Sequence, residues 1–132
     1  MQEKIGEFFE ELGAPLSNVR WSWGAISIDS SKLFLRVWDD ELETIDDAEC
    51  IKFLDPGYAG RSSGYAERRR QIKALRTSIE RYGVLCTAQS TDEKVRKIAS
   101  FERGYLLKLG RLVMHRGCIF LEVLDRIEVD AA

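Results

Sequence analysis

Two runs of β-branched and aromatic residues near the N-terminus constrain the fold more than any other feature of the sequence. They cover residues 19–28 and 32–38, and the segment Asp29-Ser30-Ser31 between them is a cluster of turn-forming residues. β-Branched and aromatic side chains favour strands, and such a cluster favours a reversal of the chain. The sequence therefore predicts a β-hairpin with Ser30 and Ser31 at its tip.

The predicted register of this hairpin gathers tryptophans on one face of the sheet. A two-residue tip places Trp23 opposite Trp38 and Trp21 opposite Asp40, so that the three indoles share one face. Gly24 falls where the apolar residues change from one face to the other, a position where we expect a bulge or a close approach of two backbone segments.

The remaining chain predicts an α+β fold in a single domain, residues 1–132. We expect a helix at 5–12, a strand near 50–54, a central helix at 65–82, a strand at 83–89, an extended return at 95–101, and a hairpin at 106–129 that turns at Arg116-Gly117. Short connections favour antiparallel pairing. The expected architecture is a small curled antiparallel sheet or a β-barrel, with an N-terminal helix and one central helix packed against it.

Few residues suit catalysis or metal binding. The three cysteines lie in apolar surroundings, which favours reduced core thiols, and the one histidine, His115, lies beside the predicted surface turn. Ser62 is the centre of a Gly-x-Ser-x-Gly match, but a Pro-Gly loop precedes it instead of a strand, and His115 is the only possible base. We therefore expect a binding protein with no catalytic residue, metal or cofactor. With no apolar run long enough to span a bilayer and no secretory signal, a soluble, cytoplasmic protein is expected.

Charge is distributed unevenly although the net charge is only −2. Acidic residues dominate 39–49, where we expect a solvated loop, and seven Lys or Arg residues lie in 61–81. Along the predicted central helix the cations form a ridge beside the apolar stripe, and exposed amides at its start attract anions. The candidate phosphate-binding residues are Arg61, Ser62, Arg69, Arg70, Lys73 and Arg76. The alternative is an ordinary solvated helix face.

The tryptophans and their neighbours are the candidate ligand-binding residues. An indole that faces a cleft offers a flat surface for a planar ligand, with polar groups at the edge; alternatively, the rings pack under the N-terminal helix. Arg68 lies within the apolar stripe, so it either reaches the helix surface, or is buried against carbonyl or carboxylate partners and extends towards a pocket. The candidates are Arg20, Trp21, Ser22, Trp23, Trp38, Asp39, Asp40 and Arg68.

Two segments, 18–25 (NVRWSWGA) and 35–41 (LRVWDDE), carry a resemblance to known domains. Together with 64–68 (GYAER) and the strand at 84–86, they resemble the PUA-like β-barrel readers of the SRA, EVE, ASCH and YTH group. In that group an aromatic-lined pocket holds a modified or unpaired base, and some members are fused to nucleases. The resemblance implies that Trp21, Trp23 and Trp38 stack on a base, that Asp39 or Asp40 binds its edge, and that a partner protein such as a nuclease would perform any cleavage.

Three functions are expected on these grounds. The first is a domain that binds DNA or RNA and reads a modified or flipped base, with the basic helix on the phosphates. The second is a protein-interaction or immunity-type module that uses the acidic segment and the basic helix. The third is a small-ligand-binding barrel or weak enzyme that uses Arg68.

Overall fold

A single β-sheet organises the fold in a computed structural model that describes residues 4–18, 22–57, 63–92 and 96–132. The described chain contains two α-helices, α1 (Ile5–Glu11) and α2 (Ser63–Leu75), and short 3-10 helices η1 (Asp39–Glu41) and η2 (Val129–Ala131). The strands are β1 (Gly24–Ile26), β2 (Lys32–Trp38), β3 (Leu42–Ile45), β4 (Ala48–Leu54), β5 (Glu80–Ala88), β6 (Ile98–Phe101), β7 (Tyr105–His115) and β8 (Cys118–Glu128).

The eight described strands form one sheet in the order β1-β2-β5-β7-β8-β4-β3, with β6 beside β5. Every pairing is antiparallel except that of β2 with β5, which is parallel. The predicted α+β class, the mostly antiparallel pairing and the two helices are therefore confirmed. The described sheet is not closed into a barrel, because β1 and β3 lie at opposite ends of the strand order.

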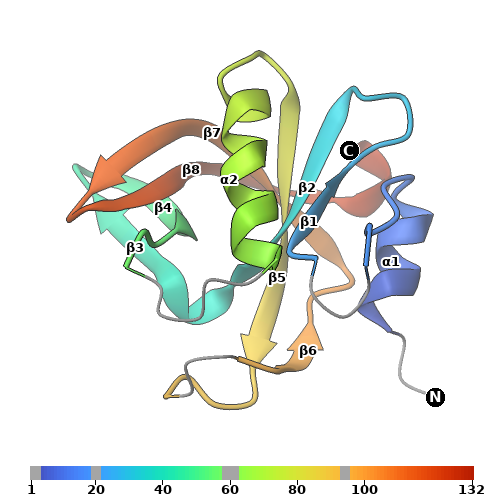
Figure 1. Cartoon of the computed structure of the whole chain (residues 1–132), viewed down its shortest axis with the longest axis horizontal. Helices are drawn as coiled ribbons and strands as arrows, with labels where there is room; N and C mark the ends of the chain where they lie inside the picture. The colour runs from blue at the N-terminus through green and yellow to red at the C-terminus, as the bar shows by residue number, and fades with distance from the viewer. Residues whose placement is uncertain (1–3, 19–21, 58–62, 93–95) are drawn as a thin grey trace.

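The two helices pack against separate cores on opposite faces of β2, and in Figure 1 α2 crosses the front of the sheet while α1 lies beyond β1. Successive residues of β2 alternate between the faces, so Leu33 and Leu35 join the core beneath α2, whereas Phe34 joins the core beneath α1. The first core includes Tyr65 and Leu75 of α2, Ile51, Leu107 and Leu121. The second includes Phe8 and Phe9 of α1, Tyr82, Val84 and Leu106.

The register of the first hairpin differs from the predicted one by two residues. Gly24 pairs with Leu35 and Ile26 with Leu33, because the carboxylate of Asp29 accepts hydrogen bonds from Ser27 and Ser31 and widens the loop. The close approach predicted at Gly24 is confirmed, since a Cβ there would lie 2.7 Å from the carbonyl oxygen of Phe34. The predicted strand at 19–28 shortens to three described residues.

The central helix is shorter than predicted. It ends at Leu75, because the guanidinium of Arg81 donates to the carbonyl oxygens of Leu75 and Thr77 and thereby satisfies groups that a longer helix would have bonded. Residues from Glu80 onward instead pair with β2. Ile79 and Tyr82 fitted the helical stripe, but the alternation of apolar residues from 82 to 86 equally suits a strand.

The acidic segment is not the predicted loop. It forms η1 and the β3–β4 hairpin, which turns at Asp46 and Asp47 with φ of 48° and 67°. Leu42 and Ile45 supply the apolar contacts that hold this hairpin. The turn predicted at Arg116-Gly117 is confirmed, with φ of 49° and 78°.

The burial predicted for the cysteines and for the apolar residues of the last hairpin is confirmed only in part. Cys50 and Cys86 are free and buried as expected, and Cys118 is half-buried. Met114 lies in an apolar run of the C-terminal hairpin, where the pattern suggests core, but it is 67% exposed. Among the described helices, none has the length and apolar character needed to cross a membrane.

Candidate ligand site beside strand β2

The predicted wall of three indoles is wrong for the two tryptophans that the structure describes. Trp23 packs against the core beneath α2, and Trp38 packs against the core beneath α1, so they lie on opposite faces of the sheet. A register difference of two residues leaves each side chain on its face, so the change of face arises in the backbone at Gly24, where Trp23 lies just before β1 begins. Arg20 and Trp21 lie outside the described residues.

Trp38 ends β2 beside a bidentate ion pair. The guanidinium carbon of Arg96 lies 5.5 Å from the centre of the indole, and its Nη1 and Nη2 lie 2.7 and 2.9 Å from the carboxylate oxygens of Asp40. The hydrogen bond to this carboxylate raises the pKa of Arg96. Asp39 accepts a hydrogen bond from Thr87. Both aspartates, predicted as ligand contacts, are therefore engaged within the protein.

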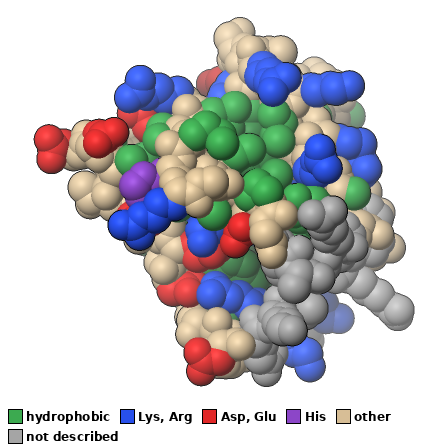
Figure 2. Space-filling model, turned by 60° about the vertical axis from the view of Figure 1, so that its left-hand side comes forward, with side chains coloured by type: hydrophobic (Ala, Val, Ile, Leu, Met, Phe, Trp, Pro, Cys, Tyr) green, Lys and Arg blue, Asp and Glu red, His purple; other side chains and the backbone are tan. Residues whose placement is uncertain are grey.

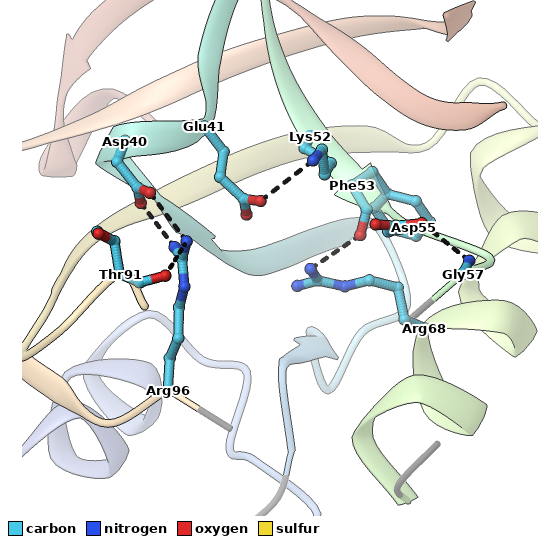
Figure 3. Close-up of polar contacts among 9 residues, drawn as sticks. All are labelled: Asp40, Glu41, Lys52, Phe53, Asp55, Gly57, Arg68, Thr91 and Arg96. Atoms are coloured by element: carbon cyan, nitrogen blue, oxygen red, sulfur yellow. Dashed lines mark hydrogen bonds and ion pairs between the residues drawn. The ribbon is translucent and has the colours of Figure 1, made fainter. Parts of the chain in front are cut away.

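Glu41 and Lys52 form a second ion pair next to the first (Figure 3). Glu41 Oε2 lies 3.5 Å from Lys52 Nζ, and the two side chains remain 21% and 29% exposed. Burial raises the pKa of Glu41, although the positive charges of Lys52 and Arg96 oppose the shift. A carboxylate and an ammonium thus lie side by side, within reach of solvent, where they can accept and donate hydrogen bonds.

Arg68 approaches the same region from α2 (Figure 3) and is almost completely buried. Its Nη1 donates to the carbonyl oxygen of Phe53 at 3.0 Å, and its Nη2 donates to those of Trp23 and Arg36 at 2.8 and 2.6 Å. The guanidinium carbon lies 5.4 Å from the centre of the Trp23 ring. The alternative with carbonyl partners is confirmed, and the one in which Arg68 reaches the helix surface is wrong.

Burial gives Arg68 an unusual charge environment. Removal of water lowers the pKa of its guanidinium to about 10, and the nearby positive charge of Arg36 adds to the effect. Its Nε is buried and has no hydrogen-bond partner among the described residues. The negative charge of Glu41 acts in the opposite direction, which places these two groups within electrostatic range of each other.

Ser22 is a structural residue and not the predicted ligand contact. It is fully buried, and its Oγ donates to Glu67 Oε2 at 2.9 Å. The other carboxylate oxygen of Glu67 accepts from the backbone N–H of Trp23 at 3.0 Å. Glu67 therefore fastens the segment before β1 to α2, so that Trp23 and Arg68 keep their relative positions.

The cationic ridge predicted on the central helix is present in part. Arg69, Arg70, Lys73 and Arg76 are exposed, and none of them forms an ion pair within the described part of the chain. Four unpaired cations near one another attract anions such as phosphates. Arg61 and Ser62 fall outside the described residues.

One face of the molecule combines apolar and charged side chains. Figure 2 shows a hydrophobic patch with acidic and basic side chains gathered below it and further Lys and Arg side chains around its margin. Sequence reasoning identified Trp23, Trp38 and Arg68, but it missed Glu41, Lys52 and Arg96. Over residues 4–18, 22–57, 63–92 and 96–132, no group of three or more His, Cys, Asp or Glu residues could hold a metal ion.

Comparisons with known proteins add no assignment. Neither protein-family models, nor curated protein sequences, nor solved structures gave a match to this chain. A function must therefore be inferred from the residues of this chain and their geometry.

Proposed function

We propose that this domain binds nucleic acid and reads a modified or flipped base at the site beside β2. One observation carries the proposal: Arg96 and Arg68 lie on either side of the partly exposed Glu41–Lys52 ion pair (Figure 3), and each guanidinium contacts a tryptophan ring, that of Trp38 and that of Trp23 respectively. Planar aromatic and guanidinium groups stack on bases, and a base turned out of a duplex is recognised by stacking together with hydrogen bonds to its edge.

Each group has a distinct task in this proposal. The plane formed by Trp38 and Arg96 stacks on the base. The Glu41 carboxylate accepts a hydrogen bond from an amino group on the base edge, and the Lys52 ammonium donates to a ring nitrogen or carbonyl oxygen beside it. An adjacent acceptor and donor match the mixed edge that most bases present. The exposed cations of α2 hold the phosphates.

The resemblance to PUA-like readers supports the same proposal. It rests on the segments 18–25 and 35–41, and the second of these contributes Trp38, Asp40 and Glu41 to the site. In this proposal the domain is a cytoplasmic reader of DNA or RNA with no catalytic step of its own, and a partner protein such as a nuclease would act on the bound nucleic acid.

Fluorescence anisotropy titrations of labelled duplexes test the proposal. The duplexes carry one methylated base, one mismatched base or neither, and each is measured at several salt concentrations. We expect tighter binding to one of the first two, and affinity that falls steeply as salt rises. Lys73→Gln should weaken binding to all duplexes alike and reduce the salt slope by about one. Glu41→Gln should weaken only the preferred duplex, by roughly tenfold or more.

Glu10→Gln, an equal change of charge at an exposed position of α1, serves as the matched control and should leave both titrations unchanged. Binding that is absent, that ignores salt, or that loses no discrimination when Glu41 is replaced would overturn the proposal.

A further inference from the structure

A groove of about 500 Å³ lies between α2 and the edge of the sheet. Its floor is β1, one wall is the face of α2 that carries Arg70, Gln71 and Ala74, and Pro15 contributes to the other wall. It is distinct from the site beside β2, because neither Glu41 nor Lys52 lines it. Of the described residues proposed to bind phosphates, Arg70 alone lines this groove.

The floor of the groove presents unused backbone groups. β1 lies at one end of the strand order and is therefore an edge strand of the sheet. Trp23 pairs with Arg36 and Ser27 with Lys32 through ladder hydrogen bonds, so by the antiparallel alternation the N–H and C=O groups of Gly24 and Ile26 point away from β2. Outside the β1–β2 ladder, no described residue makes a hydrogen bond to them.

The nearest covering segment cannot complete the sheet. Gly13 accepts a hydrogen bond from the N–H of Ile28, two residues beyond the end of β1, and Pro15 and Ser17 line the same groove as β1. Pro15 follows Gly13 by two residues, and proline has no N–H to donate to a ladder. The edge beside Gly24 and Ile26 therefore stays open to a further strand.

The α2 wall supplies two side chains that are suited to a peptide. Gln71 is only 7% exposed, yet its buried Oε1 has no hydrogen-bond partner among the described residues. A buried amide without a partner costs free energy, which a matching donor would recover, and rotation of the amide exchanges its donor and acceptor ends. Arg70, at the rim, is exposed and makes no ion pair in the described part of the chain.

We infer that this groove binds an extended peptide segment of a partner protein, which adds a strand to β1. The peptide backbone bonds to Gly24 and Ile26, the amide of Gln71 bonds to a peptide group, and Arg70 pairs with an aspartate or glutamate of the peptide. Ile26 and Ala74 give this groove an apolar lining. A peptide fits better than nucleic acid, because Arg70 is the one cation among the described residues that line the groove, whereas the other exposed cations of α2 lie outside it.

Selection from a displayed library of random heptapeptides on the full-length chain tests the inference. We expect the selected peptides to share β-branched residues and one acidic position. Binding should slow amide hydrogen exchange at Gly24 and Ile26, the groups that a new strand would cover. Arg70→Glu should weaken the selected peptides by about tenfold. Arg69→Glu, the same change one residue away and outside the groove, should leave peptide affinity intact.

A second variant separates loss of the groove from loss of charge. Ala74→Trp fills the groove without changing charge and should abolish peptide binding while the circular dichroism spectrum stays that of the wild-type protein. Nucleic-acid titrations keep this inference separate from the proposed function, because Arg69→Glu and Arg70→Glu should weaken duplex binding equally. The inference would be overturned if no peptides were enriched, or if the enriched peptides bound Ala74→Trp as tightly as wild type. It would also be overturned if the groove bound duplexes, so that Ala74→Trp abolished duplex binding.

Discussion

Arg68 shows how one charged side chain can hold three parts of a small domain together. Its guanidinium lies where α2 would otherwise present an apolar residue, and it donates to carbonyl groups from β2, β4 and the segment before β1. Burial of a charge is unfavourable, and its lowered pKa reflects that penalty. The hydrogen bonds offset the penalty, and they fix the indole of Trp23 against α2.

Replacement of Arg68 by methionine should therefore destabilise the protein strongly. The new side chain fills a similar volume but leaves three carbonyl groups without this donor, so we expect the free energy of unfolding to fall by about 3 kcal/mol. Urea denaturation measures the change. Arg69→Met, on the exposed face of the same helix, should change stability by less than about 0.5 kcal/mol. Equal effects of the two substitutions would show that the buried hydrogen bonds do not contribute as described.

Glu41 should make stability depend on pH in a predictable direction. Burial raises its pKa above the ordinary value of 4.5, so the folded protein binds the proton more tightly than the unfolded chain. Between 4.5 and the raised pKa, stability therefore increases as pH falls. As pH falls through that interval, the free energy of unfolding of wild type should increase relative to that of Glu41→Gln. Below the interval, the difference should become constant. Urea denaturation at a series of pH values measures this difference, and a shift of opposite sign would contradict the environment described for Glu41.

At the scale of elements, β1 depends on a glycine where two backbone segments approach closely. An added Cβ at Gly24 would meet the carbonyl oxygen of Phe34 at 2.7 Å and the Cα of Leu35 at 3.2 Å, which are backbone atoms that cannot swing aside. Gly24→Ala should therefore destabilise the protein by about 1–3 kcal/mol. Gly57→Ala is the control, since a Cβ at Gly57 would meet only the side chain of Asp55. Thermal unfolding of the two variants compares them, and equal midpoints would contradict this account.

The elements that could be predicted from sequence are those that local pattern determines. Helix α1 follows from apolar spacing, and the β7–β8 hairpin follows from two apolar runs around Arg116-Gly117. The end of α2 could not be predicted, because Ile79 and Tyr82 continue the helical stripe, whereas Tyr82, Val84 and Cys86 also fit the period of two of a strand. The strand β3 was hidden by the acidic residues around it, and its pairing with β4 depends on the turn at Asp46 and Asp47.

The candidate site was predictable only where its residues carry a signal of their own. Trp23, Trp38 and Arg68 stand out because an aromatic or charged residue interrupts an expected pattern. Arg96 does not, since it binds Asp40, a residue 56 positions away, and only the completed sheet brings the two together. Lys52 is likewise one charged residue in a strand until Glu41 is placed beside it. Tertiary contacts of this kind have no local sequence pattern.

At the scale of the whole molecule, the sheet is shared by the two larger of its three cores. Residues of β2 alternate between them, and the parallel pairing of β2 with β5 connects the N-terminal hairpin to the rest of the sheet. Both cores pack on the same strands, so unfolding of those strands would expose the apolar side chains of both cores to solvent. The described chain should therefore unfold as one cooperative unit.

The tryptophans allow this cooperativity to be tested from both faces of the sheet. Trp23 reports on the core beneath α2 and Trp38 on the core beneath α1. Two variants, each with Trp21 replaced by phenylalanine and only one of these indoles retained, are unfolded in urea and followed by fluorescence and by far-ultraviolet circular dichroism. Because unfolding removes the shared sheet from both cores at once, the two signals should give the same midpoint and slope within each variant. A Trp38 signal that changes before the sheet unfolds would instead mean that α1 and its core separate first, as an independent unit.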